Sequence, residues 1–371
     1  MNSPDTASMV RMVRDAASIM ALEQRADGSF PPGHNGPHHD PETPVRNTAY
    51  WLYTLSFLTS RGCTEFAVPA HRAADYLCSQ PARPMSAAFH CRTDPTKDLC
   101  NGLVGQVWVL ESLLYASQAL GREALFSCAR EVFYLHAWDD HHCGWRSLNV
   151  DGSYGPLNAT FNQQLWMAAI AAQINEPESL RRAEQYLTRV LPGAVTYQDG
   201  VIYHDSYATR QIGLRESPAQ GGTQTLKRIR RRFRMKEKRQ RSLGYHAFNL
   251  AALPPLMRAF PQDGFWQSRP FQRMTDAHQQ SSFQGEIDNK FSFAYNPVGY
   301  EYNYFLAAIQ RDLDPGLLEK QNALYQIADG RISLTAPSED HHTTVARLYE
   351  LCRLLDTLEP NAGQTTAYAA R

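Results

Sequence analysis

The stretch NPVGYEYNYFLAAI (296–309) opens with polar residues and ends in an apolar run, and this order decides the fold class. Apolar residues that recur every three or four positions predict a helix, while polar side chains at its enclosed start need partners or a ligand. The same order recurs in TPVRNTAYWL (43–52), DLCNGLVGQVWVLE (98–111), TFNQQLWMAAI (160–170), SLGYHAFNLAAL (242–253) and HTTVARLYEL (342–351). The sequence therefore predicts six helices that begin polar and end buried.

Helical periodicity extends outward from these six segments over most of the 371 residues. Strand patterns are few, and VTYQDGVIYH (195–204) predicts one short hairpin around Asp199 and Gly200. We expect helices at roughly 7–24, 46–61, 65–80, 100–119, 121–135, 160–174, 177–191, 243–259, 263–279, 298–311, 315–328 and 342–357.

Short connections between these helices alternate with segments of about 13 to 50 residues, which are long for a compact domain. The short connections make helical hairpins, and the long ones lead from one hairpin to the next. Six hairpins close into a ring, so we predict an all-α (α/α)6 toroid whose long loops lie on one face. Residues 1–371 are expected to form this single domain, with 212–242 as a basic surface insertion within it.

Composition supports a large core, because 43% of the residues are hydrophobic and 11% are aromatic. Lys+Arg and Asp+Glu both number 37, so overall charge indicates no polyionic partner. The first residues carry charges without the apolar core of a signal peptide, and no run is apolar for long enough to span a membrane. Seven scattered cysteines without a CxxC pair are typical of reduced thiols. We expect a cytoplasmic protein.

The segment KRIRRRFRMKEKRQR (227–241) is the strongest local charge anomaly, with ten Lys or Arg residues against Glu237. Such a run is typically a solvated surface. It could also hold an anionic saccharide or make peripheral contact with acidic lipid headgroups of the inner membrane. No nucleic acid is expected, because nothing else in the chain is typical of a nucleic-acid-binding module.

The polar starts of the inner helices converge on one rim, where we expect a cup. Glycoside hydrolysis requires two carboxylates with different pKa values. Asp98 lies at a helix start, which favours its ionised form, and is the candidate base or nucleophile. Glu301, between Tyr300 and Tyr302, is the candidate acid. Each also has a structural interpretation, Asp98 as a helix cap and Glu301 as the partner of a core arginine.

Other polar residues at the rim are candidates for binding substrate. Arg46 and Arg347 would hold a carboxylate through the planar guanidinium, and the amides and His246 would bind hydroxyl groups. The predicted catalytic residues are Asp98, Glu301 and His246, and the predicted substrate-binding residues are Glu42, Arg46, Asn47, Asn101, Gln106, Gln164, Asn249, Tyr300, Asn303 and Arg347.

The histidines include three adjacent pairs, at 38–39, 141–142 and 341–342, each in or at the end of a long loop. Adjacent helical positions do not face each other and no HExxH motif occurs, so no metal site is predicted, and no cofactor. These loop histidines are candidates for general bases or for partners of sugar hydroxyl groups.

Four stretches carry a resemblance to a known group: QRADGSFPPGHNGPHHDPETPVRNT (24–48), KDLCNGLVGQVWVLESL (97–113), LNATFNQQLWMAAIAAQI (157–174) and FAYNPVGYEYNYFLAAI (293–309). The chain resembles six-hairpin, glycosidase-like proteins of bacterial polysaccharide gene clusters. In architecture it is distantly similar to the unsaturated glucuronyl and rhamnogalacturonyl hydrolases, in which a rim aspartate hydrates a lyase-made double bond. The resemblance implies an (α/α)6 fold and a saccharide substrate, and it carries over only Asp98.

The sequence thus predicts a carbohydrate-active enzyme of the glycoside hydrolase type, acting on an acidic oligo- or polysaccharide in bacterial polysaccharide metabolism. One alternative is a uronate lyase or epimerase on the same toroid, with His246 or Tyr300 abstracting the proton next to the carboxylate. The other is a non-catalytic saccharide-binding or assembly protein of a polysaccharide-export system, tethered by residues 227–241.

Overall fold

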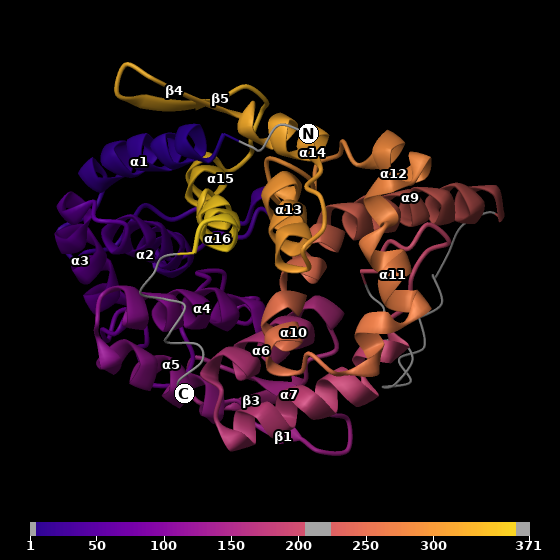
Figure 1. The fold of residues 1–371 in the computed structure, drawn as a ribbon. Coiled ribbons are helices and arrows are strands. Elements are labelled where there is room, and N and C mark those ends of the chain that lie inside the picture. The colour runs from indigo at the N-terminus through magenta and orange to yellow at the C-terminus, as the bar shows by residue number, and fades with distance from the viewer. Residues whose placement is uncertain (1–4, 205–223, 361–371) are drawn as a thin grey trace.

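A computed structural model describes residues 5–204 and 224–360, with only the backbone described for 224–233. Helices form a ring around a central axis (Figure 1). Its inner wall is made by α2 (Val45–Ser60), α4 (Val104–Ala119), α6 (Phe161–Ile174), α9 (Gln224–Ala251) with α10 (Leu253–Ala259), α13 (Val298–Ala308), and α15 (His341–Ala346) with α16 (Tyr349–Leu358). The ring closes where α16 packs against α2. The predicted all-α toroid is confirmed.

Outer helices cover this wall and differ from it in their burial pattern. Almost every residue of α2 is buried, whereas α5 (Glu123–Leu135) buries only one face, at Leu125, Ala129, Val132 and Phe133. Full burial is typical of a wall helix and one-sided burial of a surface helix. The other outer helices are α1 (Thr6–Leu22), α3 (Ala67–Leu77), α7 (Pro177–Arg189), α11 (Arg269–Thr275) and α14 (Pro315–Asn322), and the short α12 (Ser281–Glu286) lies beside α9.

Two small antiparallel sheets replace segments that were expected to be loops or, at 325–328, the end of a helix. One joins β1 (Trp138–Asp139), β2 (Gly144–Leu148) and β3 (Tyr154–Leu157), and the other joins β4 (Tyr325–Ala328) to β5 (Arg331–Leu334). The predicted hairpin at 195–204 is a turn closed by one bridge, between Thr196 and Ile202. Five short 3-10 segments, at Gly36–His38, Thr64–Phe66, Leu191–Gly193, Gly264–Gln267 and Ala277–Gln279, complete the described elements.

The predicted boundaries of two inner helices were wrong. The segment 243–259 breaks before α10, because Pro254 and Pro255 cannot donate backbone hydrogen bonds to the preceding turn. The segment 342–357 is divided between α15 and α16 at Arg347 and Leu348.

The basic run does not form an insertion separate from the inner wall. Residues 224–241 extend α9 in front of the predicted helix start, in keeping with the high helix propensity of Lys, Arg, Gln and Glu. Residues 212–223 and the side chains of 227–233 lie outside what the structure describes. The predicted membrane contact stays a prediction, and none of the described helices is long and apolar enough to cross a membrane.

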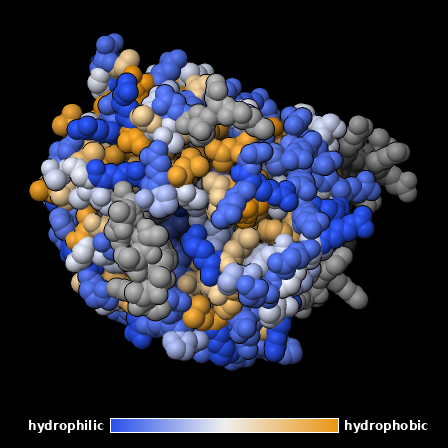
Figure 2. All heavy atoms as spheres, viewed as in Figure 1, coloured by the Kyte–Doolittle hydropathy of each residue, from blue (hydrophilic) through white to orange (hydrophobic). Residues whose placement is uncertain are grey.

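Figure 2 shows hydrophilic and apolar side chains interspersed over one face of the molecule. Among the described residues, the large apolar side chains with high exposure are scattered along the chain: Leu22, Val68, Met85, Tyr154 and Met235. Scattered exposure of this kind is ordinary for a protein surface.

Candidate functional site

A cavity of about 230 Å³ lies where the inner helices begin. Loops that precede five of the inner helices contribute to its wall, as expected for a toroid whose long loops lie on one face. Its lining residues are Asn35, His38, Asp40, Arg46, Arg92, Asn101, Val104, Trp108, Thr160, Asn162, Gln163, His204, Tyr245, Phe248, Tyr295, Asn296 and Arg347.

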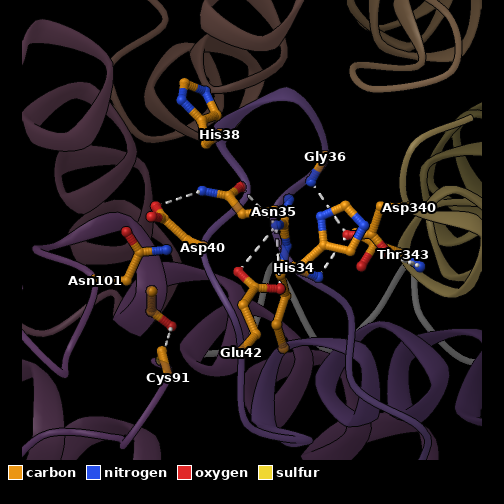
Figure 3. A network of polar contacts seen from close by, with 12 residues as sticks. His34, Asn35, Gly36, His38, Asp40, Glu42, Cys91, Asn101, Asp340 and Thr343 are labelled. Carbon is orange, nitrogen blue, oxygen red and sulfur yellow. Dashed lines mark hydrogen bonds and ion pairs between the residues drawn. The ribbon is translucent and has the colours of Figure 1, made fainter. Parts of the chain in front are cut away.

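The loop before α2 is held in place by Asp340, at the start of α15 (Figure 3). Its Oδ2 accepts hydrogen bonds from the backbone N–H groups of His34 (2.9 Å) and Gly36 (3.2 Å). Although burial opposes ionisation, these bonds and the charge of Arg46 lower the pKa of Asp340. Gly36 has a φ of +52°, and a Cβ there would lie 2.5 Å from the ring of Tyr295. The loop is thereby fixed with His38 and Asp40 in the cavity wall.

Arg46 is the central cation of the site and is almost fully buried. Its Nη1 donates to Asn35 Oδ1 (2.9 Å) and Glu42 Oε1 (3.2 Å), and its Nε donates to the Tyr50 hydroxyl (3.0 Å). The guanidinium carbon lies 3.9 Å from the centroid of the Trp108 ring, a cation–π contact. Nη2 has no hydrogen-bond partner among the described residues. Arg46 is therefore fixed in orientation with one donor still to be satisfied.

Six further side chains of the wall carry a buried polar atom without a partner among the described residues. These atoms are Arg92 Nε, Asn101 Nδ2, Trp108 Nε1, Asn162 Oδ1, Asn296 Nδ2 and Arg347 Nε. With Arg46 Nη2, the wall presents six donors and one acceptor. An unsatisfied buried polar group costs about 1–3 kcal/mol, so this cavity favours a ligand rich in hydrogen-bond acceptors.

Two histidines from earlier parts of the chain, His38 and His204, contact Tyr245 in the cavity. His38 Nε2 is 3.3 Å from the Tyr245 hydroxyl, and the rings of His204 and Tyr245 lie 4.5 Å apart. Burial, together with the charges of Arg241 and Arg46, lowers the pKa of His38 from 6.5 to about 4. Burial also raises the pKa of Tyr245, which therefore keeps its proton. His38 is neutral at physiological pH and can accept a proton.

Asp40 is the one carboxylate among the described residues that line the cavity. It forms an ion pair with Lys97, and Arg92 Nη1 lies 3.9 Å from its Oδ2. Asp98 is not in the lining, and its side chain is 44% exposed. Its Oδ1 accepts the Gly102 N–H (3.0 Å) in the manner of a helix cap and lies 3.8 Å from Arg92 Nη2. Arg92 thus lies between the two carboxylates.

The predicted acid, Glu301, does not reach the cavity. It is fully buried, and its Oε1 accepts a hydrogen bond of 2.5 Å from Arg347 Nη2. Burial and the neighbouring Glu350 carboxylate raise the pKa of Glu301 to about 8, against the charge of Arg347. Glu301 therefore has the structural role of pairing with a core arginine. It positions Arg347, which does line the cavity.

The predicted role of His246 as a base or hydroxyl partner is corrected by its contacts. Its Nδ1 accepts the Ile202 N–H (3.1 Å), and its Nε2 lies 3.0 Å from the carbonyl oxygen of Met274. Both ring nitrogens are committed to backbone, and the side chain is fully buried outside the cavity lining. His246 ties the turn at 195–204 and the end of α11 to α9.

Several predicted sugar-binding residues serve to hold loops. The side-chain amide of Gln106 accepts a hydrogen bond from the Phe89 N–H and donates one to its carbonyl oxygen. The amide of Gln164 does the same with the backbone of Trp145. Asn303 bonds the backbone of Asp314. Of the remaining residues, Asn47 donates to the Pro31 carbonyl, Tyr300 donates to Asn322, Glu42 pairs with Arg46, and Asn249 is buried outside the lining.

Only Arg46, Asn101 and Arg347 among the predicted residues line the cavity. His38 was indicated by its loop histidine pair, whereas no sequence signal distinguished Asp40, Arg92, Tyr245 or Tyr295 from other polar loop and helix residues. The described residues contain no group of three or more His, Cys, Asp or Glu side chains that could hold a metal ion.

The sequence and the fold of the chain are similar to those of known proteins. No family model matches the chain. The chain is 35% identical over 353 residues to the archaeal glycosylation protein Q of Haloferax volcanii, covering 90% of this chain and 94% of that protein. Its fold is similar to that of cellobiose 2-epimerase from Bacillus thermoamylovorans (TM-score 0.62, 9% identity, 93% and 99% of the two chains covered). It is also similar to the GH76 α-mannanase of Bacteroides thetaiotaomicron (TM-score 0.59, 10% identity, 95% and 98% covered).

Proposed function

Because the chain belongs to the family of the archaeal glycosylation protein Q, we propose that it is a carbohydrate-active enzyme that moves a proton at a carbon atom of an anionic sugar, as an epimerase or isomerase does. The family name and the folds of sugar-modifying enzymes support action on carbohydrate. The observation that carries the finer proposal is a neutral histidine, His38, in a cavity whose wall presents mainly unsatisfied donors.

The reaction needs a base and a stabilised oxyanion. A neutral imidazole takes the proton from the carbon next to a carbonyl group, and the electron pair of the C–H bond moves to the carbonyl oxygen. Donors already fixed in the wall, such as Arg46 Nη2 and Asn296 Nδ2, can stabilise the negative oxygen without reorganising. Return of a proton to the other face of the same carbon gives the epimer. Delivery of the proton to the former carbonyl carbon gives the isomer, when the hydroxyl group on the deprotonated carbon passes its proton to the oxyanion and becomes the new carbonyl group. His204 is the candidate second imidazole.

The charge of the wall supports an anionic sugar as the substrate. Arg46, Arg92 and Arg347 all line the cavity, against Asp40 alone among the described lining residues. A planar guanidinium binds a carboxylate with two parallel hydrogen bonds. The volume of about 230 Å³ is below the range of about 300–1,000 Å³ for drug-sized ligands, which favours one sugar unit.

A panel of neutral hexoses and the corresponding uronic acids tests the proposal, with isomeric products separated by chromatography and identified by NMR. We expect wild type to isomerise a uronate, and His38→Gln to be folded but inactive. Arg46→Lys keeps the charge but loses the planar fork, so KM should rise for the uronate by about tenfold and less for the neutral sugar. If none of these sugars is isomerised while their glycosides, added to the same panel, are hydrolysed, the proposal is overturned.

Glycoside hydrolysis is the second candidate, because Arg92 holds two carboxylates together. Asp40 and Asp98 each lie within 4 Å of this guanidinium. They are thus about 10 Å apart at most, within the range of about 5–10 Å that glycosidase pairs span. Under this reading, Asp98→Asn abolishes turnover of a glycoside while His38→Gln retains it. Proton transfer predicts the opposite result for both variants.

A further inference from the structure

A second, smaller pocket adjoins the cavity on the side of α9. Its volume is about 150 Å³, and it is lined by Tyr203, His204, Arg234, Glu237, Lys238, Arg241 and Ser242. His204 lines both this pocket and the larger cavity. Ser242 Oγ accepts the His204 N–H (3.0 Å) and donates to the Lys238 carbonyl (2.8 Å), which fixes the shared residue against the helix.

The pocket is cationic because one face of α9 turns toward it. Arg234, Lys238 and Arg241 are spaced by four and three residues, so they lie on the same side of the helix. Glu237 is the one acid of the lining, and it lies 3.7 Å from Arg241 and 3.6 Å from Lys290. Lys290 thus offsets its charge from outside the lining. Three cations against one acid leave the pocket positive.

The remaining basic residues of this part of α9 lie elsewhere. Arg239 is paired with Asp199 and Glu286, and Lys236 is exposed outside the pocket lining. The pocket therefore gathers three of the five basic side chains that are described in this part of α9. A concave cluster of Arg and Lys beside tyrosine and serine suits the oxygens of a phosphate group, where Arg gives paired hydrogen bonds and Lys a point charge.

We propose that this α9 pocket binds the phosphate or diphosphate of a sugar phosphate ester whose sugar ring occupies the adjoining cavity. This inference rests on the proposed function and specifies its substrate class. His204, shared by both pockets, would then lie at the junction between sugar and phosphate. The pocket is concave and small, so it accommodates a phosphate ester better than a flat lipid surface.

Inorganic pyrophosphate, titrated calorimetrically into the full-length protein, tests the pocket without requiring turnover. Lys238→Gln should weaken binding by about tenfold, whereas the matched charge change Lys236→Gln on the same helix should have little effect. These side chains are partly or fully exposed, so the variants should fold, which circular dichroism checks. Absence of saturable binding by wild type would overturn the proposal. Equal weakening by Lys236→Gln would also overturn it, because it indicates unspecific attraction to the helix.

Two further measurements complete the test. One identifies the carrier of the phosphate group, and the other separates failure of the pocket from failure of the proposed function. Competition of pyrophosphate by uridine diphosphate, or by farnesyl diphosphate, distinguishes a nucleotide carrier from a polyprenyl carrier. His38→Gln should bind pyrophosphate as wild type does. Pyrophosphate binding without turnover of any sugar or sugar phosphate would overturn the proposed function and leave the pocket standing. Turnover of free uronates by a protein that does not bind pyrophosphate would overturn the pocket alone.

Discussion

His38 and His246 have the same lowered pKa but differ in what their rings contact. In both residues burial is the largest cause, and in both the pKa is about 4. His38 lines a cavity and contacts a tyrosine hydroxyl, while both nitrogens of His246 contact backbone groups. A perturbed pKa therefore marks a candidate site only where the group can also reach a ligand.

Replacing His246 should damage stability and spare chemistry. His246→Leu leaves the Ile202 N–H and the Met274 carbonyl without their partner, so we expect a loss of about 2–4 kcal/mol of unfolding free energy. The exposed His342 offers a matched control, since His342→Leu should change stability by less than about 0.5 kcal/mol. Urea denaturation measures both. Loss of kcat in fully folded His246→Leu would restore this histidine as a catalytic candidate.

The pH dependence of turnover should report His38. The base works only when neutral, and with a pKa of about 4 it stays neutral until the pH falls close to that value. We expect kcat/KM to fall as pH decreases through about 4, and to show no decrease near 6.5, the ordinary histidine value. Arg241→Gln removes a cation that lowers this pKa, so its acid limb should move to higher pH. A circular dichroism spectrum that is unchanged over the same pH range excludes unfolding as the cause.

Part of the site could be predicted from the sequence, and the missing part has a physical reason. Arg46, Asn101 and Arg347 were found because polar residues cluster at the starts of buried helices. The same rule selected Gln106 and Gln164, whose amides bond loop backbone instead. A helix position determines the turn on which a side chain lies, whereas the loop that meets it determines whether it faces a ligand or a peptide group. Those loops have no periodic pattern to reveal their path.

At the scale of elements, periodicity predicted most helices and missed the short strands. Strands such as Tyr154–Leu157 have four residues, too few for an alternating pattern to be distinguished from a loop. Tyr325–Ala328 is equally short and was assigned to the end of the helix expected at 315–328. The break between α9 and α10 follows from two adjacent prolines that were visible in the sequence. The apolar residues on both sides of the prolines keep a helical periodicity, which by itself predicts one helix over 243–259.

Close packing of α9 against the loop between α12 and α13 predicts that one substitution of a glycine strongly affects stability. A Cβ on Gly244 would collide with the carbonyl oxygen of Phe291, in the loop that leads to Tyr295 and Asn296. Gly244→Ala should therefore destabilise the protein by about 1–3 kcal/mol and lower activity. Gly285→Ala in α12 meets no atom within 4 Å and should be neutral or stabilising by up to about 1 kcal/mol. Thermal unfolding compares the pair, and equal melting temperatures would contradict the packing argument.

At the scale of the whole molecule, a line of buried charges runs along the inside of the ring. Arg347 contacts Glu301 and Glu350, and Arg353 contacts Glu350 and Glu111. Arg347 lines the sugar cavity, whereas Glu111 and Arg353 line a larger cavity of about 930 Å³ near the other ends of the inner helices. Three carboxyl groups share two guanidinium groups, which agrees with the raised pKa of Glu301.

Removing one cation from this line should be costly. Arg353→Met leaves Glu111 and Glu350 without their shared guanidinium, and loss of one partner of a buried pair typically costs about 3–5 kcal/mol. Burial already raises the pKa of Glu111 and the charge of Arg353 opposes this rise, so loss of the guanidinium should raise that pKa further. The native state then binds more protons than the unfolded state, and stability should fall as pH increases. Denaturant titrations at several pH values measure this slope. A cost below about 1 kcal/mol would show that the line is not a coupled network.

Solvent deuterium exchange tests the central claim most directly, since it reports breakage of the C–H bond itself. An accepted anionic sugar is incubated in D2O with wild type or with folded His38→Gln, and deuterium at the carbon next to the carbonyl group is followed by NMR. We predict incorporation by wild type and its loss in the variant. Exchange by the variant at the wild-type rate, or turnover by wild type with that C–H bond intact, would contradict proton transfer by His38.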